Sequence, residues 1–380
     1  SFVFDCSTAE KKPTNTKDDN NSDGGASEET GSDKVLAFSV SPSGKLVALT
    51  DDTKRLVLFH CEPSWQCISI RWVVRRCTSL MFSQAEDELL ATDKSGDVYS
   101  FSVVEPQREG ELKMGHLSML LAVSMSPDDK YIITADRDEK IRVSHLRSPY
   151  NIQSFCLGHQ QFVSALLVPS GHPHWLLSGS GVCVHFTKFH YHTCAHRPLI
   201  TIMIFIFSIL MPTVCRITSS ADARHVAVQC ERVSTVHFFT VDQEGEEKLV
   251  PHRRVSLSHC PLDMTFDPEG RLWVLMDSSD APLQIYTHRR DSWECDAESP
   301  ELNRVTEAFK PHWDTLEAST KTNNRFEHLY KVSFDNVTTY LQKKRQRLEK
   351  QQQKRGVAQK ANSNKKTKKE TSEAVTESST

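Results

Sequence analysis

The sequence predicts an all-β protein whose fold is a seven-bladed β-propeller. The first observation is a doubled pair, Gly115-His116 and Gly158-His159, whose members lie 43 residues apart. Each pair is followed by a polar turn and by runs rich in β-branched and aromatic residues. A repeat of about 40–45 residues with four short strands is typical of a propeller blade.

A second observation gives the same period. Four residues hold equivalent places in successive repeats, separated by 42, 43 and 44 positions: Asp51, Asp93, Asp136 and Ser180. Alternation of apolar and polar residues around these positions indicates strands rather than helices.

Residues 1–6 are expected to be a late strand of a truncated first blade, because the chain starts with Ser1 and is β-rich at once. Residues 8–34 are almost entirely polar and are expected to form a disordered loop, since they cannot offset the entropy of ordering. Strand and turn patterns then recur at residues 36–59, 79–101, 121–144, 169–181, 224–241 and 262–287. Together with the partial unit at the start these make seven units, and a closed ring would pack each blade against two neighbours and so cover the faces that a lone sheet leaves unburied.

The repeat is broken at residues 182–214, in the fourth complete blade. The sequence there predicts an aberrant insertion, and we interpret it as translated non-coding sequence that replaces the last strands of the blade. Its apolar run, residues 199–211, has 13 residues, whereas a membrane-spanning helix needs about 20. We therefore expect no membrane association.

The same stretch offers an alternative, a zinc site. Its ligand types suit zinc, but their spacing matches no standard zinc finger, so we expect no metal. The residues concerned are Cys183, His185, His190, His192, Cys194 and His196.

The C-terminal region is predicted to be a helical extension, residues 301–355, followed by a disordered tail, residues 356–380. Ser299-Pro300 would open a short helix and Pro311 would end it. From Phe326 onward apolar residues fall at helical spacing and predict a second helix along one face.

The charge of the chain is divided unevenly. The net charge is −3, yet residues 341–369 carry 12 Lys or Arg and one Glu. A basic segment on a mildly acidic body favours contact with an anion, nucleic acid first, through Lys343, Lys344, Arg345 and Arg347. A solubilising tail or a nuclear import signal are the alternatives. Eleven cysteines without a C-x-x-C pair indicate a reducing compartment.

Candidate structural residues follow from the repeat. In WD-repeat blades a buried polar network joins the Gly-His loop to the turn after the second strand, and His116, Thr134 and Asp138 hold the corresponding places, with His159 in the next repeat. No P-loop, nucleophile elbow or Cys/His/Asp constellation occurs in the sequence, so we expect no catalytic residues.

Residues 93–101, 117–121, 126–129, 134–144, 154–159 and 329–337 resemble the non-catalytic WD-repeat subunit of the eukaryotic tRNA (guanine-N7) methyltransferase. The resemblance implies a heterodimer in which a catalytic subunit binds S-adenosylmethionine and forms 7-methylguanosine in the tRNA variable loop. It implies that this chain binds no cofactor. The role that it implies for this chain is to stabilise the catalytic subunit and to help position tRNA. The location that we expect is the nucleus, or also the cytoplasm.

The repeat also suggests where a partner binds. Lys94 and Arg137 lie in equivalent turns of adjacent blades, so they should share one rim of the propeller, continued by Asp138, Glu139, Lys140 and Arg142. A mixed-sign cluster suits a partner of complementary charge. The alternatives are a solvated turn of the same composition, or a structural role in which Asp138 and Arg142 hold the blade together. The resemblance favours docking of the catalytic subunit here. An adaptor for a ubiquitin ligase or a DNA-repair enzyme is the alternative function.

Overall fold

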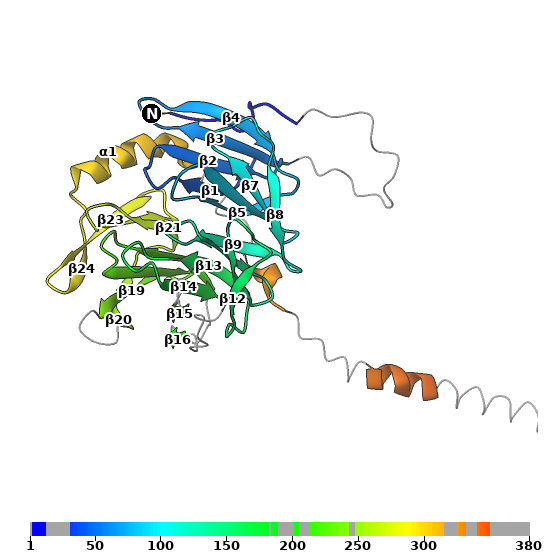
Figure 1. Cartoon of the computed structure of the whole chain (residues 1–380). Helices are drawn as coiled ribbons and strands as arrows, with labels where there is room; N and C mark the ends of the chain where they lie inside the picture. The colour runs from blue at the N-terminus through cyan, green and yellow to red at the C-terminus, as the bar shows by residue number, and fades with distance from the viewer. Residues whose placement is uncertain are drawn as a thin grey trace, which may run out of the picture. The chain divides into compact units, whose positions relative to one another are not determined.

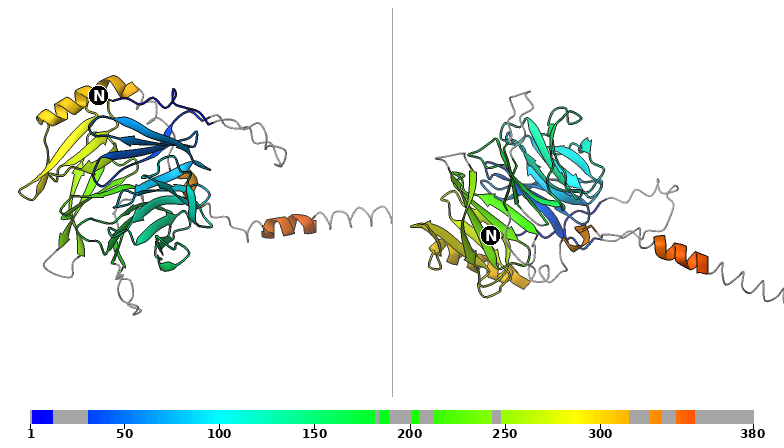
Figure 2. Two further views of the ribbon diagram at one scale, coloured as in Figure 1. Left: turned by 45° about the horizontal axis from the view of Figure 1, so that its top comes forward. Right: turned by 90° about the horizontal axis from the view of Figure 1, so that it is seen from below.

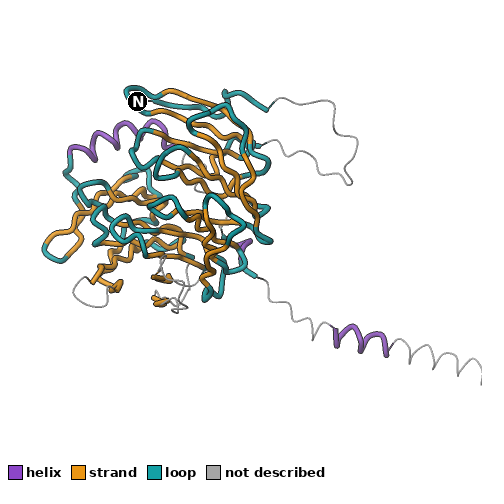
Figure 3. The backbone as a smooth tube through the Cα atoms, viewed as in Figure 1, coloured by secondary structure: helices purple, strands orange, loops and turns teal. Residues whose placement is uncertain are grey.

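The computed structural model describes residues 2–12, 31–181, 184–188, 201–204, 213–242, 248–314, 326–331 and 340–349. The chain divides into two units, Ser1–Tyr330 and Lys331–Thr380. All the strands of the described residues lie in the first unit, and they dominate its structure (Figures 1 and 3).

The first unit contains six four-stranded antiparallel sheets in its described residues, each built from consecutive strands. We name them sheets A to F in chain order. Sheet A consists of β1 (Val35–Val40), β2 (Leu46–Asp51), β3 (Arg55–His60) and β4 (Gln66–Trp72). Sheet B consists of β5 (Cys77–Phe82), β6 (Glu88–Asp93), β7 (Asp97–Ser102) and β8 (Glu111–Gly115). Sheet C consists of β9 (Leu120–Met125), β10 (Tyr131–Asp136), β11 (Ile141–His145) and β12 (Ile152–Cys156).

The second half repeats the pattern. Sheet D consists of β13 (Val163–Leu167), β14 (Trp175–Ser180), β15 (Val184–Lys188) and β16 (Thr201–Ile204). Sheet E consists of β17 (Val214–Ser219), β18 (His225–Cys230), β19 (Thr235–Asp242) and β20 (Lys248–Ser256). Sheet F consists of β21 (Pro261–Phe266), β22 (Leu272–Met276), β23 (Leu283–Arg289) and β24 (Ser292–Cys295).

The sheets follow one another in chain order around the unit (Figure 2). Successive first strands lie against each other, from β1 through β5, β9, β13 and β17 to β21. The hydrophobic core is divided among the spaces between neighbouring sheets. Leu58 of sheet A packs in one cluster with Phe82 of sheet B, and Leu90 of sheet B packs in the next cluster with Ile132 of sheet C. This arrangement is that of a β-propeller, as the repeat predicted.

The turn between the first and second strands is built alike in several sheets. A buried serine directly follows the first strand, and its Oγ accepts a hydrogen bond from the backbone N–H five residues later, as Ser126 does from Tyr131 at 3.0 Å. The same contact is made by Ser41, Ser83 and Ser220. Positive φ angles recur three residues after these serines, at Gly44, Glu86, Asp129 and Ala223.

These turns also join neighbouring sheets. The carboxylate of Asp129 accepts hydrogen bonds from the backbone N–H groups of Gln84 and Ala85, both at 2.8 Å. Glu86 in turn accepts one from the Ser43 hydroxyl at 2.9 Å. Acidic residues in these turns therefore hold adjacent sheets together.

The predicted number of blades was wrong, because the described residues form six sheets rather than seven. Residues 2–12 contain no strand. Instead, the ring of Phe2 stacks on Trp65 at 5.2 Å between centroids, and Phe4 meets Phe59 edge to face at 4.9 Å. The N-terminal residues thus pack aromatic side chains against sheet A without pairing as a strand.

Both ends of the predicted disordered loop, residues 8–34, are held by contacts. The fully buried guanidinium of Arg55 lies 2.7 Å from an Asp33 carboxylate oxygen and donates to the Glu10 carbonyl at 3.1 Å. Residues 13–30, the middle of this loop, lie outside the described part of the chain.

The break at residues 182–214 is also less complete than predicted. Strand β15 pairs with β14 from Val184↔Gly179 to Lys188↔Trp175, and β16 pairs with β15. Val184 is fully buried in the cluster between sheets D and E. Segments of this stretch therefore complete sheet D instead of leaving it interrupted, since their β-branched and aromatic residues satisfy the pairing pattern of a strand.

The C-terminal elements are shorter than predicted. Helix α1 (Pro300–Phe309) begins at a proline and is followed by the 3₁₀ helix η1 (Lys310–His312), which contains Pro311, as the sequence predicts. α1 lies along β23 (Figure 1), and Glu301 bonds to Arg271 at 2.7 Å. The prediction of a continuous helix from Phe326 was wrong for residues 326–331. There the short 3₁₀ helix η2 (Glu327–Leu329) is followed by extended backbone at Tyr330. The second unit contains a helix at residues 340–349.

Candidate functional site

Two equivalent turns of sheets B and C are joined by one connection. Lys94 lies in the turn between β6 and β7, and Arg137 lies in the turn between β10 and β11. The connection between β8 and β9 touches both: the His116 N–H donates to the Gly96 carbonyl at 2.8 Å, and the Arg137 N–H donates to the Met119 carbonyl at 2.9 Å. We call the two turns, with Lys94, Arg137, Asp138, Glu139, Lys140 and Arg142, the docking rim.

Close backbone approach holds this rim together. Gly96 has a φ of +96°, and a Cβ at this position would lie 2.6 Å from the carbonyl oxygens of His116 and Ser118. Only glycine fits such a conformation and such a contact without displacement of the connection.

A buried polar network lies directly beneath. The His116 Nε2 lies 2.8 Å from the Thr134 hydroxyl, and its Nδ1 lies 3.2 Å from an Asp136 carboxylate oxygen. The sequence correctly assigned His116 and Thr134, but the carboxylate that reaches the imidazole is that of Asp136, not of Asp138. Asp136 is the last residue of β10 and is buried, whereas Asp138 lies two residues further, in the turn.

The Asp136 carboxylate is held in its charged form. Burial alone raises its pKa, but hydrogen bonds from His116 and from the Lys140 backbone N–H lower the pKa of Asp136 below its ordinary value. The next sheet repeats the hydroxyl contact of this network, because the His159 Nε2 lies 2.8 Å from the Ser178 hydroxyl.

The residues of the docking rim differ in exposure. Lys94 and Lys140 are exposed, whereas Asp138 and Glu139 are half-buried. Arg142 is half-buried and donates to the Gly115 carbonyl at 3.2 Å, and burial lowers the pKa of its guanidinium. Arg142 therefore supports the connection between the turns, which is the structural alternative that the sequence left open.

Arg137 contacts a segment that sequence reasoning did not place here. Its Nε donates to the Leu329 carbonyl at 3.3 Å. Residues 326–330, which we call the C-terminal strap, insert Phe326 and Leu329 against Phe162, and the Tyr330 hydroxyl lies 2.6 Å from the Thr213 hydroxyl. The apolar spacing from Phe326 was the signal for this contact, although it was interpreted as a helix face.

The predicted nucleic-acid residues lie on the helix of the second unit. Lys343, Lys344, Arg345 and Arg347 all have exposed side chains within residues 340–349. The rest of the basic segment, from residue 350 onward, lies outside the described residues.

The described residues offer little chemistry of their own. Burial raises the pKa of Cys77, Cys156 and Cys230 to about 12, so these thiols stay protonated at neutral pH. The candidate zinc residues from Cys183 to His196 fall outside the described side chains. In the part of the chain that the structure describes, no helix has both the length and the apolarity to cross a bilayer.

The chain matches a known family over most of its length. The family model of the tRNA methyltransferase TRM82 WD40 domain matches residues 6–114 and 103–300. The tRNA (guanine-N(7)-)-methyltransferase non-catalytic subunit wdr4 of Danio rerio is 57% identical over 380 residues, covering 98% of this chain and 91% of the relative. The Homo sapiens subunit WDR4 is 42% identical over 347 residues, covering 90% and 82%.

A solved structure shares the fold. A putative 6-phosphogluconolactonase from Bacteroides fragilis superimposes with a TM-score of 0.57 over 69% of this chain and 83% of that chain. Its sequence identity is 13%, so the likeness concerns the fold alone.

Proposed function

Because this chain belongs to the tRNA methyltransferase TRM82 WD40-domain family, we propose that it is the non-catalytic subunit of a tRNA (guanine-N7) methyltransferase. It binds a separate catalytic subunit, stabilises that enzyme and helps to position tRNA for formation of 7-methylguanosine in the variable loop. The catalytic subunit, rather than this chain, binds S-adenosylmethionine. The observation that carries the proposal is the 57% identity over nearly the whole chain to a relative with that name.

We propose the docking rim as the surface that binds the catalytic subunit. Its two turns are held at a fixed separation by the β8–β9 connection and by Gly96, so its charges are preorganised. Lys94 and Lys140 are exposed and have two half-buried acidic neighbours, Asp138 and Glu139. Such a mixed pattern favours one orientation of a partner with complementary charges and disfavours others. Arg137 and Arg142 act mainly by holding the strap and the connection in place.

The tRNA contact is proposed for Lys343, Lys344, Arg345 and Arg347. Their side chains are exposed on one short helix, and phosphate contacts by Lys and Arg release counterions from the nucleic acid. The same basic segment supports a nuclear location, which fusion of residues 341–369 to a fluorescent protein would test.

The test is co-purification with the catalytic subunit. Reversal of Glu139 and Lys140 (Glu139→Lys with Lys140→Glu) keeps the net charge but exchanges the signs on the rim. We expect at least ~10-fold weaker binding, because each reversed charge then faces a like charge of the partner. Binding measured at low and moderate salt reports both the affinity and its electrostatic part.

Lys130→Glu is the control for charge reversal at an exposed lysine outside the rim. Lys130 is an equally exposed lysine in the turn between β9 and β10, at the opposite end of these strands, and it pairs with Asp128 at 2.9 Å. Binding should be unchanged in this variant. Equal binding by the rim variant and the wild type would refute the assignment of the rim, whereas recovery of ligase subunits without a methyltransferase would refute the function.

A further inference from the structure

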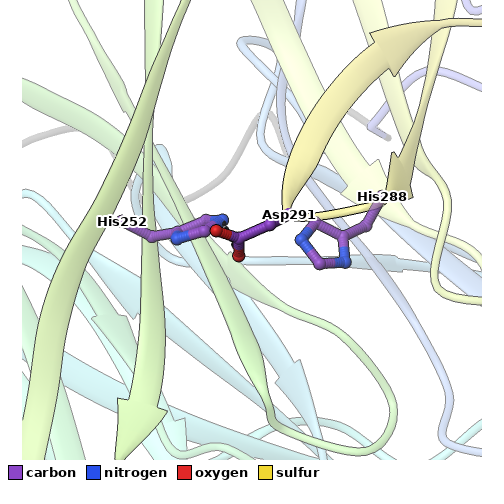
Figure 4. A group of neighbouring side chains, drawn as sticks. All are labelled: His252, His288 and Asp291. Atoms are coloured by element: carbon purple, nitrogen blue, oxygen red, sulfur yellow. Dashed lines mark ion pairs between the residues drawn. The ribbon is translucent and has the colours of Figure 1, made fainter.

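Two histidines and an aspartate meet where the outer strands of sheets E and F lie side by side. His252 belongs to β20 and His288 belongs to β23, while Asp291 lies in the turn between β23 and β24. Figure 4 shows the Asp291 carboxylate beside the imidazole of His252, with the imidazole of His288 on its other side. Residues from two sheets, about 40 positions apart in sequence, therefore converge on one point.

The spacing of the three side chains suits a metal ion. One ligand atom from each residue lies within 4.8 Å of the others, and the His252 Nε2 lies 3.6 Å from an Asp291 carboxylate oxygen. Zinc ligands at 2.0–2.1 Å in tetrahedral geometry lie about 3.3 Å apart. The side chain of Asp291 is 80% exposed, so it is free to make the remaining adjustment by rotation.

The imidazoles lack other partners for the atoms concerned. The Nε2 atoms of His252 and His288 are both shielded from solvent and form no hydrogen bond within the described residues. Buried polar atoms normally have a partner, and those without one call for an explanation such as an ion. The surroundings on the sheet side are aromatic, with Trp293 at 5.2 Å and His225 at 4.5 Å from the ring of His288. Neither ring supplies a hydrogen bond to His288 Nε2.

We propose that His252, His288 and Asp291 bind a zinc ion, with water in the fourth position. Imidazole nitrogen and one carboxylate are ligands that suit zinc and related transition metals, and they are too few in oxygen for magnesium or calcium. The ion would tie β20 to the β23–β24 hairpin and so fasten sheet E to sheet F. Its role is structural, since metal that binds the folded state stabilises it.

The experiment uses the full-length protein after treatment with a chelator. Titration with Co²⁺ should produce visible d–d absorption at a ratio of one ion per chain, and added Zn²⁺ should abolish it. The melting temperature should rise with Zn²⁺ and fall again with chelator. Asp291→Asn should weaken Co²⁺ and Zn²⁺ binding at least ~10-fold and His252→Ala at least ~100-fold, because loss of even an outer-shell partner costs 10–100-fold.

Asp291→Asn also protects the test against misfolding. Asp291 is exposed and has a φ of +68°, a conformation that asparagine tolerates well. His259→Ala, which removes an exposed histidine of the following loop, is the matched control and should bind Co²⁺ like the wild type. Equal Co²⁺ affinity in the wild type and both site variants would overturn the proposal. So would a thiolate-to-cobalt charge-transfer band, which would assign the ion to cysteine, or absence of d–d absorption at millimolar Co²⁺.

Discussion

Replacement of Asp136 tests whether the buried network beneath the docking rim works as its geometry indicates. The Asp136 carboxylate is buried and accepts two hydrogen bonds, from His116 Nδ1 at 3.2 Å and from the Lys140 backbone N–H at 3.0 Å. A hydrogen bond to a charged group contributes about 1.5–3 kcal/mol. Two such bonds at the lower value give ~3 kcal/mol, so Asp136→Ala should lower the free energy of unfolding by about that amount.

Asp138→Ala is the matched comparison. Asp138 is half-buried in the turn, so its loss should cost less than ~1 kcal/mol, as for most substitutions away from buried networks. Urea unfolding followed by tryptophan fluorescence gives both values from the shift in midpoint and a common m value.

A double-mutant cycle with His116→Ala isolates the pair. If His116 and Asp136 interact directly, the double variant should be less destabilised than the sum of the single variants by at least ~1 kcal/mol. Additive effects within ~0.3 kcal/mol, or a larger cost at Asp138 than at Asp136, would refute the reasoning.

Three further predictions concern other parts of the chain. Gly96→Ala should lower the free energy of unfolding by at least ~2 kcal/mol and weaken binding of the catalytic subunit, because its Cβ would meet two carbonyl oxygens. Gly44→Ala should lower it by only about 1 kcal/mol, because Gly44 has a φ of +75° but open space around it. Equal losses for the two variants in urea unfolding would contradict this. Burial, and then the charge of Arg254, lower the pKa of His237 to about 4. His237 therefore takes up a proton near pH 6.5 in the unfolded chain but not in the folded chain. The free energy of unfolding should fall by ~2 kcal/mol as the pH drops from 7 to 5, and His237→Leu should remove that part of the pH dependence. Replacement of Lys343, Lys344, Arg345 and Arg347 by alanine should weaken tRNA binding and reduce the slope of log affinity against log salt by about 3; an unchanged slope in a filter-binding assay would exclude these phosphate contacts.

Local pattern explains why so much of the fold could be predicted. Alternating apolar residues and a repeated serine-containing turn specify a strand pair within about 20 residues, and they recur at a constant period. The turn serines, such as Ser126, bond to the backbone five residues away, so their role is encoded nearby. Pro300 and Pro311 likewise bracket a short helix by excluding hydrogen bonds at defined positions.

The errors have a shared origin in longer distances. Residues near Phe2 have the composition of a strand, but whether they pair depends on a neighbouring edge that composition does not specify. The apolar spacing at Phe326, Leu329 and Tyr330 fits a helix, yet these side chains pack separately against Phe162 and Thr213 from distant sheets. Tertiary contacts overrode the local periodicity in both places.

The class of fold, the repeat, the family and the network residues His116 and Thr134 could all be predicted from the order of residues in the chain. The three-dimensional contacts were needed to show that Asp136, not Asp138, faces the imidazole, because a shift of two residues along a turn changes which carboxylate points inward. They alone placed the C-terminal strap against Arg137 and brought His252, His288 and Asp291 together. Contacts between separate sheets depend on how the blades are stacked, and no spacing within one repeat records that.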